Sequence, residues 1–135
     1  MPEFYDTHAH LDSPRFARDL AQVIARAEAA GISRVITVGT DLRSSVRAIE
    51  LSEQYPAVYA AVGWHPTAAL QAPADLRPDL RRLAQHPKVV ALGETGLDFY
   101  HLPTRETRGA TPEDDQRYRQ RQTVLFQQHL EAAAE

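Results

Sequence analysis

The sequence predicts an α/β fold with a parallel sheet, and three observations support this class. Short β-rich segments alternate four times with longer segments of helical period. The predicted strands are almost continuously apolar, as expected of a parallel sheet that is covered on both faces. The composition, with 43% apolar, 24% charged and 7% aromatic residues among 135, is that of one folded domain. Four such units fit either a small open sheet or half of a closed (β/α)8 TIM-type barrel, which takes about 250 residues.

Each predicted strand is short and is followed by a helix whose apolar residues recur three and four positions apart. The four strands are expected at residues 4–8, 34–38, 57–62 and 88–93. The apolar positions of the first three helices are Leu20, Val23, Ile24 and Ala27, then Leu42, Val46 and Ile49, then Leu76, Leu80 and Leu83. These helices are expected to end at Gly31, before Pro56 and at Pro87, because glycine and proline commonly terminate helices.

The fourth helix is expected from about Gln116 to the end of the chain, and no Gly, Asn or Pro terminates it. This favours the half barrel, with a chain that ends before a fifth strand. The segment 101–115 before this helix is polar and contains Pro103, Gly109 and Pro112. We predict a long polar loop there, and loops of this length are commonly either functional or disordered.

Composition excludes several classes of site. The chain has no cysteine, which excludes disulfides, thiolate metal sites and a cysteine nucleophile. Glycine-rich nucleotide loops and a Gly-x-Ser-x-Gly motif are also absent. No apolar run approaches the roughly 20 residues of a membrane span, and no signal peptide is evident, so we expect a cytoplasmic protein without a membrane partner. The net charge of −3 indicates that any phosphate chemistry would need bound cations rather than a basic surface.

Residues 6–12 (DTHAHLD) carry the strongest sign of chemistry. On an extended chain His8 and His10 project to the same face, and two imidazoles there can bind one divalent ion. Asp6 and Asp12 are placed to orient the two rings by accepting the second N–H of each. The alternative is a pair of surface or hydrogen-bonded histidines. The position at the end of a strand, with flanking carboxylates, favours metal ligands.

Two further motifs follow the third and fourth predicted strands. Glu94, in GETGLD, comes directly after a buried strand, where a carboxylate is costly unless it is metal-bound or paired with an arginine. Asp98 in the same motif is more typical of a helix or turn cap. His65, in GWHP, lies where α/β proteins place ligands, although a lone histidine before proline is commonly a turn residue. Three such motifs at the ends of strands one, three and four predict one shared site.

The remaining polar residues give weaker signals. Tyr100 and Arg105 or Arg108 in the long loop are candidates to face a substrate, although a solvated loop surface is the simpler interpretation. The other three histidines are assigned no functional role: His86, His101 and His129.

In this order the motifs resemble the signatures of the TatD-type metal-dependent deoxyribonucleases. The segments DTHAHLD, GWHP and GETGLDFY carry the resemblance, and QRQTVLF (120–126) is similar to the family's Arg/Gln-rich helix before its fifth strand. The resemblance runs from residue 4 to the end of the chain. It implies that residues 1–135 are the N-terminal half of a single metallohydrolase barrel. Two divalent ions (Mg, Mn or Zn) would then lie at the C-terminal face of the barrel.

The resemblance also implies roles for individual residues. His8 and His10 would hold one ion, Glu94 would bridge both ions, and His65 would contact substrate phosphate. The implied reaction is hydrolysis of DNA phosphodiesters, as a 3′–5′ exonuclease on single strands. The implied catalytic residues are Glu94 and His65, the implied substrate contacts are His65, Tyr100 and Arg105, and the implied outer-shell carboxylates are Asp6, Asp12 and Asp98.

The family's remaining ligands, a histidine on the fifth strand, another after the sixth and an aspartate after the eighth, are not in these 135 residues. We therefore expect little activity from the chain alone. The full-length protein is expected to be a monomer. The half barrel is expected to self-associate through the exposed edges of its first and fourth strands.

Two alternatives stay open. One is another metallohydrolase on the same barrel, with a carboxylated lysine bridging its metals. The only lysine, Lys88, lies at the start of the fourth strand rather than at its end, which disfavours this alternative. The other is a non-catalytic half-barrel module that binds a partner through its open sheet edges.

Overall fold

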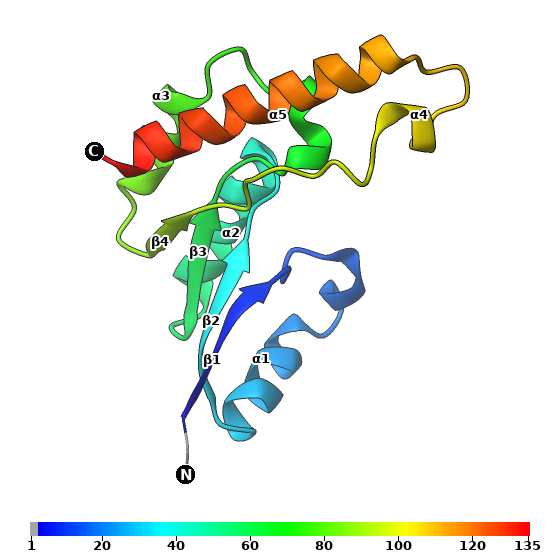
Figure 1. Cartoon of the computed structure of the whole chain (residues 1–135). Helices are drawn as coiled ribbons and strands as arrows, with labels where there is room; N and C mark the ends of the chain where they lie inside the picture. The colour runs from blue at the N-terminus through cyan, green and yellow to red at the C-terminus, as the bar shows by residue number, and fades with distance from the viewer. Residues whose placement is uncertain (1–2) are drawn as a thin grey trace.

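A computed structural model of the chain describes residues 3–135 and shows a four-stranded parallel sheet (Figure 1). The strand order is β1-β2-β3-β4, which is also the order of the sequence. The strands are β1 (Phe4–Ala9), β2 (Ile32–Val38), β3 (Val58–Val62) and β4 (Val89–Leu92). The predicted α/β class with four consecutive βα units is confirmed, and each strand lies within two residues of its predicted bounds.

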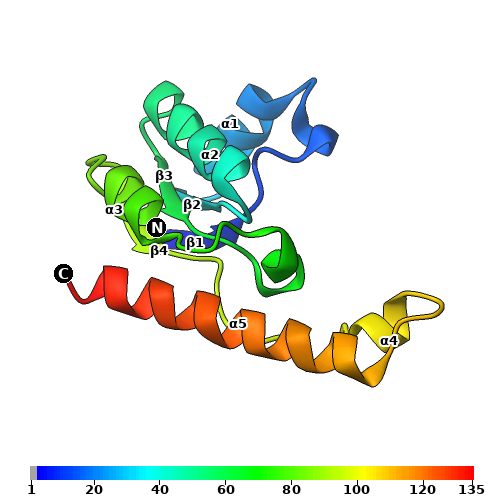
Figure 2. The same cartoon turned by 90° about the horizontal axis from the view of Figure 1, so that it is seen from above.

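The helices connect the strands and cover the sheet. They are α1 (Leu20–Ala29), α2 (Leu42–Gln54), α3 (Arg77–Ala84), α4 (Pro103–Glu106) and α5 (Pro112–Ala133), with 3-10 helices η1 (Pro14–Phe16) and η2 (Pro66–Gln71). Seen from above, α1 and α2 lie on one side of the strands and α5 runs along the other (Figure 2). Helix α5 packs against η2, α3 and α4. None of the helices within residues 3–135 has the length and apolar character that a membrane span requires.

The long loop predicted between the fourth strand and the last helix is shorter in the structure. Helix α5 begins at Pro112 rather than near Gln116, because Thr111 and Asp114 form a capping box. Thr111 Oγ1 accepts the Asp114 N–H, and the Asp114 carboxylate accepts the Thr111 N–H. Proline at the first helical position suits this start. The four-residue α4 occupies part of the remaining segment.

Two apolar clusters form the core, one on each half of the sheet. The first lies beneath α1 and α2 and contains Leu11, Ile24, Val35, Leu51 and Val58. The second joins η2, α3 and α5 and contains Ala69, Leu76, Leu80 and Leu125. Trp64, after β3, and Leu92, at the end of β4, pack against this second cluster, so α5 is attached near the carboxyl ends of these two strands.

Two glycines allow the strand ends to approach each other closely. A Cβ at Gly63, after β3, would lie 2.7 Å from the backbone of Gly93, after β4. A Cβ at Gly39, after β2, would lie 2.3 Å from Ser45 Oγ. The Ser45 hydroxyl accepts the Gly63 N–H at 3.0 Å and donates to the Gly63 carbonyl at 3.2 Å. The ends of β3 and β4 therefore meet backbone to backbone, and the Ser45 side chain lies against the ends of β2 and β3.

Candidate metal centre

Four side chains from three strand ends meet at the carboxyl edge of the sheet. His8 lies on β1, His10 follows β1, His65 follows β3 and Glu94 follows β4. They line one hollow of about 430 Å³, together with Thr40, Asp41, Thr67 and Ala68. The structure thus brings together the residues of all three sequence motifs.

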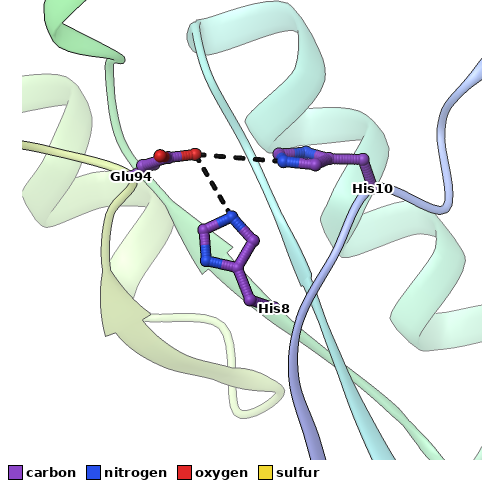
Figure 3. Close-up of side chains that lie close together, drawn as sticks. All are labelled: His8, His10 and Glu94. Atoms are coloured by element: carbon purple, nitrogen blue, oxygen red, sulfur yellow. Dashed lines mark ion pairs between the residues drawn. The ribbon is translucent and has the colours of Figure 1, made fainter.

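Glu94 is the centre of this cluster (Figure 3). Its Oε2 lies 3.3 Å from His8 Nε2 and 3.9 Å from His10 Nε2. Its other oxygen, Oε1, lies 3.3 Å from His65 Nε2. The two carboxylate oxygens therefore face different histidines, with the β1 pair on one side and His65 on the other.

The backbone around Glu94 and His65 is fixed by hydrogen bonds between the strand ends. The Glu94 N–H donates to the Gly39 carbonyl at 3.0 Å, and the His65 N–H donates to the Thr40 carbonyl at 2.8 Å. Both residues are thus anchored to the segment that follows β2. These two backbone contacts place the side chains of His65 and Glu94 in the same hollow.

His10 has the tautomer expected of a metal ligand. Its Nδ1 lies 3.1 Å from the Val38 carbonyl oxygen, which can only accept, so Nδ1 carries the proton. In the neutral ring, Nε2 is then a lone pair directed toward Glu94 Oε2. Two acceptors that face each other need a cation between them. The Val38 carbonyl thus provides the ring orientation that outer partners commonly give to metal-bound histidines.

His65 has the opposite tautomer. Its Nδ1 accepts the Thr67 N–H at 3.1 Å and lies 2.7 Å from the Thr67 hydroxyl. In the neutral ring the proton is therefore on Nε2, which donates toward Glu94 Oε1. This nitrogen is a hydrogen-bond donor rather than a ligand. His65 is suited to contact an anionic oxygen beside the metal position.

His8, His10 and Glu94 fit a divalent cation. One ligand atom from each lies within 4.8 Å of the other two. A nitrogen and a carboxylate oxygen bound to zinc at about 2.0–2.2 Å in tetrahedral geometry are separated by roughly 3.4 Å, close to the 3.3 Å between His8 Nε2 and Glu94 Oε2. Two imidazoles and one carboxylate suit zinc and similar transition metals. The three residues leave the remaining coordination positions open to water or a substrate oxygen.

The three carboxylates expected in the outer shell lie in other surroundings. Asp6 Oδ1 accepts the backbone N–H of His8 at 3.1 Å, and Asp12 lines a separate hollow of about 740 Å³ beside the start of α2. Asp98 accepts the N–H of Tyr100 at 3.0 Å and of His101 at 3.1 Å. The His101 N–H and ring lower the pKa of Asp98, consistent with a turn cap.

Tyr100 and Arg105 pair with each other at the surface. The Arg105 guanidinium carbon lies 5.6 Å from the centre of the Tyr100 ring, and Arg105 also donates to the Tyr100 carbonyl at 3.3 Å. The Tyr100 residue is 71% exposed. Neither residue lines the hollow around Glu94, so any contact with substrate would be at a distance from the metal position.

Two buried residues of α5 reach the site and were not singled out from the sequence. Gln122 is fully buried, and its Nε2 donates to the Pro66 carbonyl at 3.1 Å. His129 is also buried, and its Nε2 accepts the Trp64 N–H at 3.1 Å. The signal in the sequence was their spacing, since both fall on the apolar stripe that includes Leu125.

The fold and the site together define the class of protein: an α/β protein with a candidate metal centre at the carboxyl ends of its parallel strands, as in barrel hydrolases. The family model described as TatD related DNase matches residues 5–135. The chain belongs to this family.

Named relatives agree with this assignment. The uncharacterized metal-dependent hydrolase YabD of Bacillus subtilis is 43% identical over 96 residues, which are 71% of this chain and 38% of that protein. The 3′-5′ ssDNA/RNA exonuclease TatD of Salmonella typhimurium is 34% identical over 131 residues, 97% of this chain and 45% of that protein. The chain therefore spans less than half the length of these relatives.

A solved structure extends the comparison to the fold. The crystal structure of the TatD homologue YJJV from Escherichia coli K12 matches with a TM-score of 0.77 at 30% identity. The match covers 96% of this chain and 46% of that one.

Proposed function

We propose that this chain is the N-terminal half of a metal-dependent nuclease that hydrolyses phosphodiesters at the 3′ end of single-stranded DNA. The observation that carries the proposal is the convergence of His8 Nε2, His10 Nε2 and Glu94 Oε2 on one position. The relatives named as 3′-5′ ssDNA/RNA exonucleases support the substrate class, with RNA as a further substrate.

In this proposal Glu94 would contact both ions. Its Oε2 faces His8 and His10, and its Oε1 points away from that pair. Two divalent ions held by these residues would supply an activated water and would stabilise the leaving oxygen of an in-line displacement. They also supply the positive charge that a chain of net charge −3 lacks for binding phosphates.

His65 is the proposed contact to the substrate phosphate. Its Nε2–H lies at the rim of the same hollow, 3.3 Å from Glu94 Oε1. A phosphate oxygen that approaches the second ion can take this hydrogen bond from Glu94. Tyr100 and Arg105, which stack on each other at the surface, offer an aromatic face and a cation to nucleotides farther along the strand.

The sheet has the geometry of a half barrel. A hollow of about 290 Å³ on one face is lined by Tyr5, Arg34, Ile36, Tyr59 and Val90, which come from all four strands. In a closed barrel this face is the packed interior. Strands β1 and β4 are the two edges of the sheet. We propose that the other half of the barrel, or a second copy of this chain, covers this face, and that the chain alone is feebly active.

The lysine-bridged alternative is disfavoured by the position of Lys88. Its Nζ donates to the Pro56 carbonyl at 2.7 Å and lies 4.2 Å from the centre of the Tyr59 ring. Both contacts are at the amino end of the sheet, away from Glu94.

The proposal is tested by zinc binding and by cleavage of a 3′-labelled single-stranded oligonucleotide, with Glu94→Gln compared with Glu53→Gln. Glu53 is a matched control because it also pairs with a histidine, His86, at 3.1 Å. This pair lies away from the carboxyl ends of the strands, where Glu94 is found. We expect Glu94→Gln to lose both zinc binding and any cleavage, and Glu53→Gln to retain them. Zinc binding that survives Glu94→Gln would overturn the proposal and favour a non-catalytic half-barrel module.

A further inference from the structure

We infer that Gln122 and His129 of α5 are positioning residues that hold His65 at the metal centre through its two neighbours in the chain. The inference rests on the proposed function of His65 as the phosphate contact. It assigns to the last helix a role in the site beyond packing.

The two side chains contact the residues on either side of His65. Gln122 Nε2 donates to the carbonyl of Pro66 at 3.1 Å. His129 Nε2 accepts the N–H of Trp64 at 3.1 Å, while its Nδ1 donates to the Leu125 carbonyl at 2.7 Å. The backbone of His65 is thus fixed before and after the residue by one helix.

Gln122 also connects His65 to the segment that follows Glu94. Its Oε1 accepts the Asp98 N–H at 2.7 Å, and its Nε2 donates to the Asp98 carbonyl at 3.0 Å as well as to Pro66. A single buried amide therefore joins the loop after β3 to the loop after β4. The loop after β3 carries His65 and the loop after β4 carries Glu94, and His65 Nε2 faces Glu94 Oε1.

The burial of both side chains makes this arrangement costly to disturb. Gln122 has no exposed surface and His129 is 1% exposed. An amide or imidazole in such surroundings has no water to replace a lost partner, so its hydrogen bonds restrict the loops strongly. The two residues lie seven positions apart on the buried face of α5, which also carries Leu125.

The position of Pro66 affects the hydrogen bonding of the His65 ring. Thr67 directly follows Pro66, and its N–H and hydroxyl both point to His65 Nδ1. A shift of the Pro66 peptide moves the donors that keep the proton of His65 on Nε2. Loss of the Gln122 amide should therefore change the tautomer of His65 without touching the ring itself.

Gln128 provides a matched control on the same helix. It is also a buried glutamine with two backbone partners, since its Oε1 accepts the Leu76 N–H at 3.0 Å and its Nε2 donates to the Ala74 carbonyl at 2.9 Å. These partners belong to the segment before α3, not to the site. Methionine has a volume similar to that of glutamine but no amide, so each substitution removes one set of buried hydrogen bonds. Only Gln122→Met removes those that hold the loops beside His65.

The experiment compares Gln122→Met and Gln128→Met with the wild-type chain in two measurements. The first is the ¹⁵N NMR spectrum of the histidine side chains in the metal-free chain at one fixed pH, which reports the tautomer of His65. The second is the affinity for thymidine 5′-monophosphate in the presence of Zn²⁺, with Zn²⁺ affinity measured separately. Thermal unfolding establishes that both variants are folded.

We expect Gln122→Met to give a mixed His65 tautomer and to weaken nucleotide binding by about 10- to 100-fold, the range for loss of a hydrogen bond to a charged phosphate, with Zn²⁺ affinity changed less. We expect Gln128→Met to match the wild type in both measurements. Equal losses in the two variants, or a wild-type His65 spectrum in folded Gln122→Met, would overturn the inference.

Two further observations keep the test decisive. If Gln122→Met does not fold, Gln122→Glu repeats the comparison. A glutamate keeps the acceptor for the Asp98 N–H but removes the N–H donor to the Pro66 and Asp98 carbonyls. If the wild-type chain binds no Zn²⁺, the proposed function fails, but the histidine spectrum of the metal-free chain still decides the role of Gln122.

Discussion

The two sides of the candidate site differ in how firmly they are held. On the β1 side, His8 and His10 have side chains that are 53% and 44% exposed, and most of β1 itself is exposed. On the α5 side, His65 is 26% exposed and its flanking residues are bound by buried groups of α5. His65, the proposed phosphate contact, is thus preorganised, whereas His8 and His10, the proposed metal ligands, are held mainly by neighbouring strands.

This difference suggests a division of roles. A bound cation can itself order His8 and His10, because it would join both Nε2 atoms to the Glu94 carboxylate that they face. The cation cannot order His65 in the same way, because the Nε2 of its neutral ring carries a proton and has no lone pair to offer a metal ion. Its position therefore has to come from the protein, and α5 provides it.

The largest effect is expected on the β1 side. His10→Ala removes a ligand whose lone pair faces Glu94, so Zn²⁺ affinity should fall by more than about 100-fold, beyond the loss typical of an outer partner. His101→Ala is the control, because His101 also pairs with a carboxylate, Asp98, at 2.8 Å. Calorimetric titration with Zn²⁺ measures both. Equal affinity for the two variants would contradict the assignment of His10 as a ligand.

The next effect concerns the contact between β3 and β4. Gly63→Ala places a Cβ 2.7 Å from the Gly93 backbone, which cannot move aside as a side chain can. We expect a loss of about 3 kcal/mol in the free energy of unfolding, the upper range for overpacking. Gly93→Ala serves as the control, because its Cβ has no neighbour closer than 3.9 Å. Urea denaturation of the two variants distinguishes them, and similar midpoints would contradict the close approach.

The α5 side should also respond to pH through His129. Burial lowers the pKa of His129 below its ordinary value near 6.5. The unfolded chain then takes up a proton that the folded chain does not, so stability is full above about pH 6.5 and falls as the pH drops toward the folded pKa. Unfolding curves between pH 7.5 and 5 should show a smaller loss in His129→Gln than in the wild type. An equal loss in His129→Gln and in the wild type would contradict this role of His129.

The strands and the site could be predicted because both depend on local patterns. A change from strand period to helical period marks each βα unit, and parallel strands place their carboxyl ends at one edge. His8, His10, His65 and Glu94 all follow from these two rules. The predicted start of α5, near Gln116, is later than the observed start at Pro112, because Thr111 and Asp114 form a capping box within a segment whose polar residues, glycine and prolines predict a loop.

The contribution of α5 was harder to predict. Glutamine and histidine on a helix normally indicate a solvated face, and their burial depends on how the helix lies against the loops. The stripe of Tyr118, Gln122, Leu125 and His129, at spacings of three and four, shows that the polar residues share the apolar face. Their partners, the backbone of Trp64 and Pro66, are visible only in three dimensions.

The smallest effect compares the helix caps on the two sides. Thr111 caps the 22-residue α5 in a reciprocal capping box, whereas Ser13 caps the three-residue η1 near β1 through one bond of 3.4 Å. Thr111→Ala should lower the free energy of unfolding by about 1 kcal/mol. Ser13→Ala should cost less, because its bond is long and few backbone groups depend on it. Chemical denaturation measures both, and a larger loss for Ser13→Ala would show that the β1 side is the more firmly held of the two.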